Sequence, residues 1–280
     1  MTETRAPAPT DRPVVLTIAG SDSGGGAGIQ ADLKTIEATG GFGTSAITAV
    51  TAQHTTGVES THVLPVEEIE AQIDAVLSDF DVQAIKTGML ATAEIIETVT
   101  TMVSTTECPV VVDPVMIAES GDRLLPEAAE SAYADLLAES TLVTPNAEEA
   151  AVLTDTEPDD EPSASAAGRE LVSAGAAGAL VTGGHVPGSM VCDVLVTPDG
   201  SKPVRHPRVE TDATHGSGCT LSAAIATRVA RGEDLFEAVE RSSEFVARAI
   251  RYHHSVGEGP GAVNHLVGLR NEAVRTNGEP

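Results

Sequence analysis

The sequence predicts an α/β fold, with helices on both faces of a central, mostly parallel sheet. Short apolar, β-branched segments alternate with helical segments along most of the 280 residues. Such segments are typical of strands that are buried on both faces. No break in composition divides the chain, so we expect a single domain over residues 14–280. Three prolines within residues 1–13 predict a disordered lead-in.

The elements are expected in alternating order. The expected strands of the sheet are 14–20, 44–53, 84–89, 109–116, 141–145 and 179–182, and the helices between them are 29–39, 66–78, one from about 92, 126–139, one from about 146, and 163–174. Segments 190–197 and 203–210 predict a hairpin that crosses the face of the sheet. Helices over 217–231 and 235–252 close the chain.

The charge balance restricts the possible partners. Forty-two acidic residues against 16 basic ones give a formal net charge of -26, which disfavours nucleic acid and anionic lipid as partners. Dispersed acidic residues and only three lysines suggest adaptation to a salt-rich cytoplasm. Three cysteines without paired or metal-ligand spacing indicate a reducing compartment. No apolar run reaches eighteen residues, and we expect a cytoplasmic protein.

The segment 214–220 predicts an anion-binding site. Gly216 and Gly218 flank Ser217, and an alanine-rich helix follows at once. Backbone N–H groups at a helix N-terminus attract anions, and the macrodipole adds to that attraction. Cys219 is expected in the first helical turn, where the pKa of a thiol falls and the thiol becomes a candidate general base. The alternative is a glycine-rich turn whose cysteine only fills space.

Further candidate site residues fall at the predicted carboxyl ends of strands, where ligands bind in doubly wound sheets: Gly20, Gln53, Gly88, Asp113, Asn146 and Gly184. The amide of Gln53 can recognise a heterocycle through one donor and one acceptor. Asn146 and Glu149 have the spacing of a capping box, so helix capping and ligand binding both explain the pair.

The glycine-rich loop 21–28 follows the first predicted strand. A dinucleotide site is disfavoured because no acidic residue occurs between Glu37 and Glu59 to bind the ribose. A Walker A loop is excluded because none of the three lysines follows a glycine.

Taken together, these motifs resemble one family. The loop 19–32, Ala52-Gln53, Gly88-Met89-Leu90 and the segments 113–116, 144–150 and 215–220 occur in an order similar to that of hydroxymethylpyrimidine/phosphomethylpyrimidine kinases, which belong to the ribokinase-like superfamily. The resemblance covers roughly residues 14–265. It implies ATP-dependent phosphorylation of 4-amino-5-hydroxymethyl-2-methylpyrimidine, and then of its monophosphate to the diphosphate, in thiamine biosynthesis.

The resemblance also implies roles for individual residues. Gln53 would recognise the pyrimidine, and the residues around the ring would be Gly20, Ala27, Asp32, Met89 and Val115. Asp113 and Glu149 would lie near Mg²⁺, and the residues near the ATP phosphates would be Asn146, Glu149, Thr182, Gly184 and Ser217. Gly216 and Gly218 would furnish the anion hole, and Cys219 takes the position of a catalytic aspartate in many relatives.

One position departs from the family pattern. Many members carry a lysine before Gly-Gly-His, where this chain has Thr182. A potassium ion or an arginine is a candidate substitute for that charge. Two other functions remain open, a pyridoxal or pyridoxine kinase and a pyrimidine-binding sensor that has lost catalysis. We expect a small-molecule substrate and a homodimer.

Overall fold

The computed structural model describes residues 10–116, 124–184 and 188–267. The strands within these residues form one nine-stranded sheet. Its strands are β1 (Val14–Asp22), β2 (Phe42–His54), β3 (Gly57–Val63), β4 (Val82–Thr87), β5 (Val110–Val112), β6 (Leu142–Val143), β7 (Ala179–Val181), β8 (Met190–Thr197) and β9 (Gly200–Pro207). Their order across the sheet is β3-β2-β1-β4-β5-β6-β7-β8-β9. Six consecutive strands of this order pair in parallel, namely β2, β1, β4, β5, β6 and β7. The outer strands β3, β8 and β9 pair antiparallel to their neighbours.

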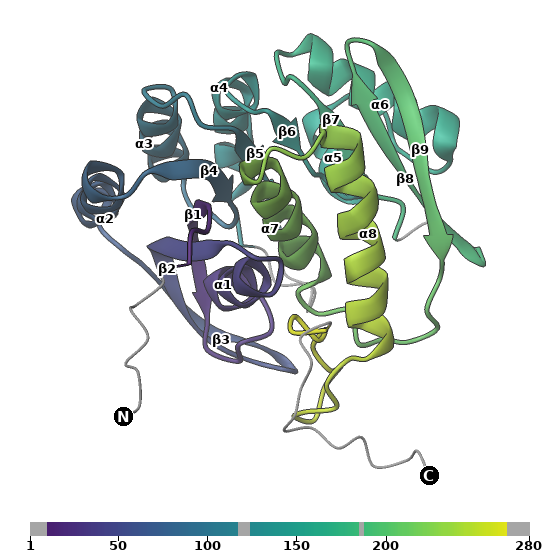
Figure 1. The fold of residues 1–280 in the computed structure, drawn as a ribbon, viewed down its shortest axis with the longest axis horizontal. Coiled ribbons are helices and arrows are strands. Elements are labelled where there is room, and N and C mark those ends of the chain that lie inside the picture. The colour runs from purple at the N-terminus through teal and green to yellow at the C-terminus, as the bar shows by residue number, and fades with distance from the viewer. Residues whose placement is uncertain (1–9, 117–123, 185–187, 268–280) are drawn as a thin grey trace, which may run out of the picture.

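Helices cover both faces of this sheet (Figure 1). Their bounds are α1 (Gly28–Ala38), α2 (Val66–Asp79), α3 (Ala93–Val103), α4 (Tyr133–Ala138), α5 (Ala147–Leu153), α6 (Glu161–Ser173), α7 (Ser217–Ala230) and α8 (Leu235–Arg251). A 3₁₀ helix, η1 (Glu127–Ala132), precedes α4. Helices α1, α7 and α8 pack on one face, and α2, α3 and α4 pack on the other.

Alternation along each strand divides the core into two layers. On β1, Leu16 and Ile18 contribute to the layer under α2 and α3, and Val15 contributes to the layer under α7 and α8. Neighbouring side chains of a strand point to opposite faces, so an uninterrupted apolar segment fills both layers at once. This explains why the buried strands show no polar alternation. Small side chains such as Ala223 and Ala226 let α7 lie close against the strands.

The predicted α/β fold is confirmed, with corrections at three elements. β3 has no predicted counterpart because every residue of Glu59–Val63 is exposed, and a polar edge strand carries no hydrophobic period. The single helix expected over 126–139 divides into η1 and α4. The hairpin β8–β9 does not cross the face of the sheet: β8 pairs with β7 and extends the sheet at its edge.

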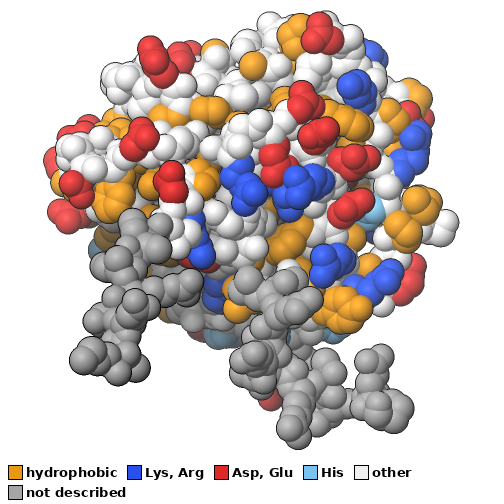
Figure 2. Space-filling model, viewed as in Figure 1, with side chains coloured by type: hydrophobic (Ala, Val, Ile, Leu, Met, Phe, Trp, Pro, Cys, Tyr) orange, Lys and Arg blue, Asp and Glu red, His pale blue; other side chains and the backbone are white. Residues whose placement is uncertain are grey.

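Surface charges of both signs are interspersed on the face formed by α1, α7 and α8 (Figure 2). Three arginines of that face, Arg228, Arg231 and Arg241, surround Glu233 within 4 Å. No helix among the described residues is long and apolar enough to cross a membrane. Most of the lead-in, residues 1–9, lies outside the described residues.

Candidate active site

A cavity of about 820 Å³ opens at the carboxyl ends of the parallel strands. Every strand from β1 to β7 except the antiparallel β3 contributes to its wall, either directly or through the segment that follows it, and α7 points its N-terminus into it. The residues expected at strand ends all line it, namely Gly20, Gln53, Gly88, Asp113, Asn146 and Gly184. The predicted convergence of these positions on one rim is therefore confirmed.

Asp22 organises the glycine-rich loop at one end of this cavity. Its carboxylate accepts hydrogen bonds from the backbone N–H groups of Gly24 at 2.7 Å, Gly26 at 2.9 Å and Ala27 at 2.8 Å. It also lies 3.1 Å from Nε2 of His215. Burial opposes the charged form, but the hydrogen bonds from His215 and the loop amides outweigh it and lower the pKa of Asp22. Sequence reasoning missed this anchor, although its position within the glycine-rich loop was a signal for it.

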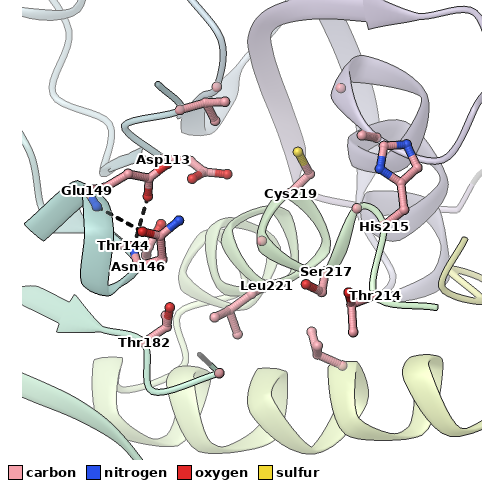
Figure 3. Close-up of a pocket in the computed structure, with 18 of the residues that line it drawn as sticks. Asp113, Thr144, Asn146, Glu149, Thr182, Thr214, His215, Ser217, Cys219 and Leu221 are labelled. Atoms are coloured by element: carbon pink, nitrogen blue, oxygen red, sulfur yellow. Dashed lines mark hydrogen bonds between the residues drawn. The ribbon is translucent and has the colours of Figure 1, made fainter. Parts of the chain in front are cut away.

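The N-terminus of α7 has the geometry of the predicted anion site. Gly216, the N-cap, has φ of +85°, and a side chain there would collide with the carbonyl oxygen of Gly26. The amide of Ser217 bonds to the carbonyl of Thr214, whereas helix geometry leaves the amides of Gly218 and Cys219 without a partner inside α7. Ser217, Gly218 and Cys219 line the cavity (Figure 3).

Cys219 lies in the first turn of α7, as predicted, but the pKa of its thiol is raised where a lowered pKa was expected. Burial, together with the charges of Asp32 and Asp113, raises the pKa of Cys219 to about 12. Lys86 and a hydrogen bond from the Gly28 amide act in the other direction and are outweighed. The expectation of an acidic thiol is therefore wrong for the unliganded chain, because desolvation exceeds the helix-terminus effect.

Asp32 does not reach the cavity. Its side chain is fully buried on the inner side of α1, where both of its carboxylate oxygens accept hydrogen bonds from Lys86 Nζ at 2.9 Å. The hydroxyl of Thr17 donates a further bond at 2.6 Å. Contact between Asp32 and a substrate ring is therefore excluded in this conformation. Lys86 itself lines the cavity, and sequence reasoning missed it because strand β4 otherwise looks like an ordinary buried strand.

Two carboxylates form the candidate metal site. Asp113 follows β5 and is 5% exposed, and Glu149 lies in the first turn of α5 and is 8% exposed. Burial and the nearby charge of Asp113 raise the pKa of Glu149 to about 8, and burial also raises the pKa of Asp113. Within the described ranges no group of three or more His, Cys, Asp or Glu side chains is arranged to hold a metal ion. A pair of buried carboxylates fits Mg²⁺, which takes one or two protein carboxylates together with waters and phosphates.

Asn146 and Glu149 also form the capping box of α5. Asn146 Oδ1 accepts the Glu149 amide at 2.9 Å, and Glu149 Oε2 accepts the Asn146 amide at 2.9 Å, as the dashed lines of Figure 3 mark. The capping interpretation is confirmed. It fixes both side chains at the edge of the cavity, so it is compatible with ligand binding.

The end of the cavity near β1 and β2 suits a small ring. Gly20, Ala27, Met89 and Val115 provide apolar or backbone surface, and all four line the cavity with Gln53. The Thr51 hydroxyl donates to the Ser21 carbonyl oxygen at 2.8 Å and also lies 3.2 Å from Gln53 Oε1. An amide among apolar groups is suited to recognising a polar heterocycle.

The opposite end carries polar and apolar groups from β7, α7 and α8. Thr182 pairs with Asn146 across the strand ends, and Arg208 donates to the carbonyl oxygen of Gly184 at 2.7 Å. Beyond them the cavity is lined by Leu221, Val246 and Ile250. These apolar residues carried no recognisable sequence signal because they belong to the ordinary buried faces of two helices.

Comparison with known proteins identifies the family. The family model described as phosphomethylpyrimidine kinase matches residues 22–264. A hydroxymethylpyrimidine/phosphomethylpyrimidine kinase of Streptomyces coelicolor is 46% identical over 260 residues, covering 92% of this chain and 96% of that protein. A thiamine biosynthesis bifunctional protein of Geobacter sulfurreducens is 44% identical, and the match covers 93% of this chain and 54% of that longer protein.

The fold of a solved structure agrees with this assignment. The pyridoxal kinase of Staphylococcus aureus in complex with ADP superimposes with a TM-score of 0.87 at 32% identity, covering 94% of this chain and 97% of the other. The central sheet and its flanking helices are thus ribokinase-like, as the resemblance implied. The chain belongs to the phosphomethylpyrimidine kinase family.

Proposed function

We propose that this protein is the thiamine-pathway kinase that phosphorylates 4-amino-5-hydroxymethyl-2-methylpyrimidine with ATP and then converts the monophosphate to the diphosphate. One observation carries the proposal: a single cavity joins a ring-sized end at Gln53 to an apolar end at Leu221, with the N-terminus of α7 between them. The curated relatives named as hydroxymethylpyrimidine/phosphomethylpyrimidine kinases support the same substrate.

The geometry supports a division of labour along the cavity. The pyrimidine lies against Gln53 with its hydroxymethyl group toward α7, and the adenine lies against Leu221 and Val246. The transferring phosphoryl group then lies near the amides of Gly218 and Cys219. Preorganised N–H donors at that point stabilise the charge that develops on the phosphoryl oxygens.

Mg²⁺ is the proposed metal, held by Asp113 and Glu149. When bound, it would neutralise charge on the ATP phosphates and orient them. The raised pKa of Glu149 supports this assignment, because a cation between two buried carboxylates relieves their repulsion. Asn146, Thr182, Gly184 and Ser217 are the proposed phosphate contacts.

Arg208 supports the arginine alternative for the lysine that this chain lacks before Gly183. Its guanidinium reaches the Gly184 carbonyl, two residues beyond Thr182, and its side chain lines the cavity. A K⁺ ion remains the other candidate. Replacing Arg208 by Gln should raise the KM for ATP and leave the KM for the pyrimidine unchanged.

Cys219 is proposed to contact the hydroxymethyl group as a neutral thiol. A pKa raised to about 12 argues against a resting thiolate base. A loose phosphoryl-transfer transition state demands little of a base, because the alcohol oxygen bonds late. Gly216 and Gly218 keep their proposed role in the anion hole.

The decisive experiment compares two alcohols in one assay. We expect ATP-dependent phosphorylation of the hydroxymethylpyrimidine, followed by the diphosphate, with kcat/KM well above that for pyridoxal. The pyridoxal kinase fold of the Staphylococcus aureus structure makes pyridoxal the second candidate substrate. A higher kcat/KM for pyridoxal would overturn the substrate assignment. Tight pyrimidine binding without turnover would indicate the sensor.

The setting of the enzyme is part of the proposal. We propose a cytoplasmic homodimer, and we infer adaptation to high salt from the net charge of -26 and the lysine-poor composition. Sedimentation in molar KCl measures the subunit number directly.

A further inference from the structure

The ion pair of Lys86 and Asp32 lies directly beneath the cavity floor. Both side chains are fully buried, and Lys86 Nζ is 2.9 Å from each oxygen of Asp32. On the side of the cavity the same nitrogen is 3.9 Å from Asp113 Oδ2. The ammonium group is thus held from below by one carboxylate and faces a second one at the site.

Gly88 packs closely against this buried ammonium at the edge of the cavity. A Cβ atom at position 88 would lie 2.9 Å from Lys86 Nζ, and Gly88 and Lys86 both line the cavity. The backbone of Gly88 has no positive φ, so backbone strain does not require a glycine at this position. The absence of a side chain at position 88 therefore lets the backbone pack directly against the buried ammonium and keeps the ammonium close to the cavity.

The charges around the cavity give this ammonium a further role. The described lining includes the acidic residues Asp22, Asp113, Glu130, Glu148, Glu149, Asp193 and Asp212. Its Lys and Arg side chains, within the same described lining, are Lys86 and Arg208. Arg208 belongs to the end near Gly184, so Lys86 is the cation beside Asp113 and the N-terminus of α7.

Stability alone is a weak explanation for such a pair. Two buried charges lose their hydration, and neutral or apolar replacements of similar volume often leave stability unchanged or improve it. Phosphoryl transfer, by contrast, needs positive charge where the negative charge of the phosphoryl group gathers.

We propose that Lys86 stabilises the transferring phosphoryl group between Asp113 and the N-terminus of α7, and that Asp32 is the positioning residue that holds its ammonium there. This inference rests on the proposed kinase function. Asp32 thereby acts on the reaction without touching the substrate, in place of the ring contact expected from the family resemblance.

A neutral replacement of the pair tests this role. The double variant Asp32→Asn/Lys86→Gln exchanges both charges for amides, so that no buried charge is left unpaired and Thr17 keeps an acceptor. The matched control is Arg12→Gln/Glu37→Gln, which removes an exposed ion pair at 2.8 Å that also involves α1. Both double variants leave the net charge unchanged. Thermal unfolding first establishes that each variant is folded.

We expect the buried double variant to lose about 10²–10³-fold in kcat, as for the removal of one preorganised electrostatic group. Its Kd for the pyrimidine, measured by calorimetry without ATP, should stay within about threefold of the parent value. The surface control should keep the parent kcat. A folded Asp32→Asn/Lys86→Gln variant with the parent kcat would overturn the proposal, because a purely structural pair is replaceable.

A second variant keeps the proposal testable if the double variant does not fold. Gly88→Ala retains the ion pair and places a methyl group between the ammonium and the cavity. Because this methyl group would lie 2.9 Å from Lys86 Nζ and 3.0 Å from Ala19 Cβ, the ammonium must shift and some stability is lost. We expect a fall in kcat of at least tenfold in the folded variant, and an unchanged kcat contradicts the proposal. Failure of the proposed function is distinguishable from either result, because the parent chain itself would then not phosphorylate the pyrimidine.

Discussion

Glu149 should make the stability of the unliganded protein depend on pH. Its carboxyl group is buried beside Asp113, which raises its pKa from 4.5 to about 8. Between these two values the folded chain holds a proton on Glu149 that the unfolded chain releases. Raising the pH therefore favours unfolding, and the stabilising contribution is complete below pH 4.5 and lost as the pH passes 8.

The size of the effect follows from the shift. One proton held by the folded state alone changes the free energy of unfolding by about 1.4 kcal/mol per pH unit, so the window from 4.5 to about 8 gives roughly 5 kcal/mol. Glu149→Gln removes this contribution while keeping an oxygen that accepts the Asn146 amide. Glu148→Gln is the matched control, since Glu148 is the exposed acidic neighbour on the same helical turn.

Urea unfolding of the three proteins at several pH values between 5 and 8 measures the difference. We expect the parent and Glu148→Gln to lose stability with rising pH more steeply than Glu149→Gln, by about 1.4 kcal/mol per unit near pH 6–7. Added Mg²⁺ should flatten the parent curve, because a bound cation stabilises the ionised pair. Parallel curves for Glu149→Gln and Glu148→Gln would refute the buried-carboxylate argument.

Three further expectations concern the substrate end, the thiol and the surface charge. Gln53→Leu should raise the KM for the pyrimidine far more than the KM for ATP, because the polar atoms of the ring lose their hydrogen bonds to the amide. Equal effects on both KM values would mean that Gln53 has only a structural role. Iodoacetamide at neutral pH should alkylate Cys219 more slowly than Cys108, since burial raises the pKa of the Cys219 thiol, and mass spectrometry of the peptides reads the order. The melting temperature should rise from dilute buffer to molar KCl, where the Debye length falls to about 3 Å and the charge of -26 is screened. A melting temperature that does not change with the KCl concentration would contradict the expected effect of charge screening.

The sequence by itself determined the architecture and the edge of the sheet where the site lies. Apolar β-branched segments can be buried on both faces only in a sheet covered by helices, so the pattern of β1, β4 and β5 was sufficient to predict the layers. The carboxyl ends of parallel strands meet at one edge of a sheet, and this rule alone predicts that Gln53, Asp113 and Asn146 lie together. Local signals also sufficed for the capping box of α5, since capping depends on residues three apart.

The tertiary structure alone decided the electrostatics. Helix position predicted an acidic Cys219, but the pKa of a thiol also depends on desolvation and on charges from other elements, and here those raise it. In the same way, Lys86 and Asp32 lie 54 positions apart, and nothing local to either residue indicates that they pair. The polar edge strand β3 was missed for a related reason: its pairing with β2 is a long-range choice that leaves no hydrophobic period in its own residues.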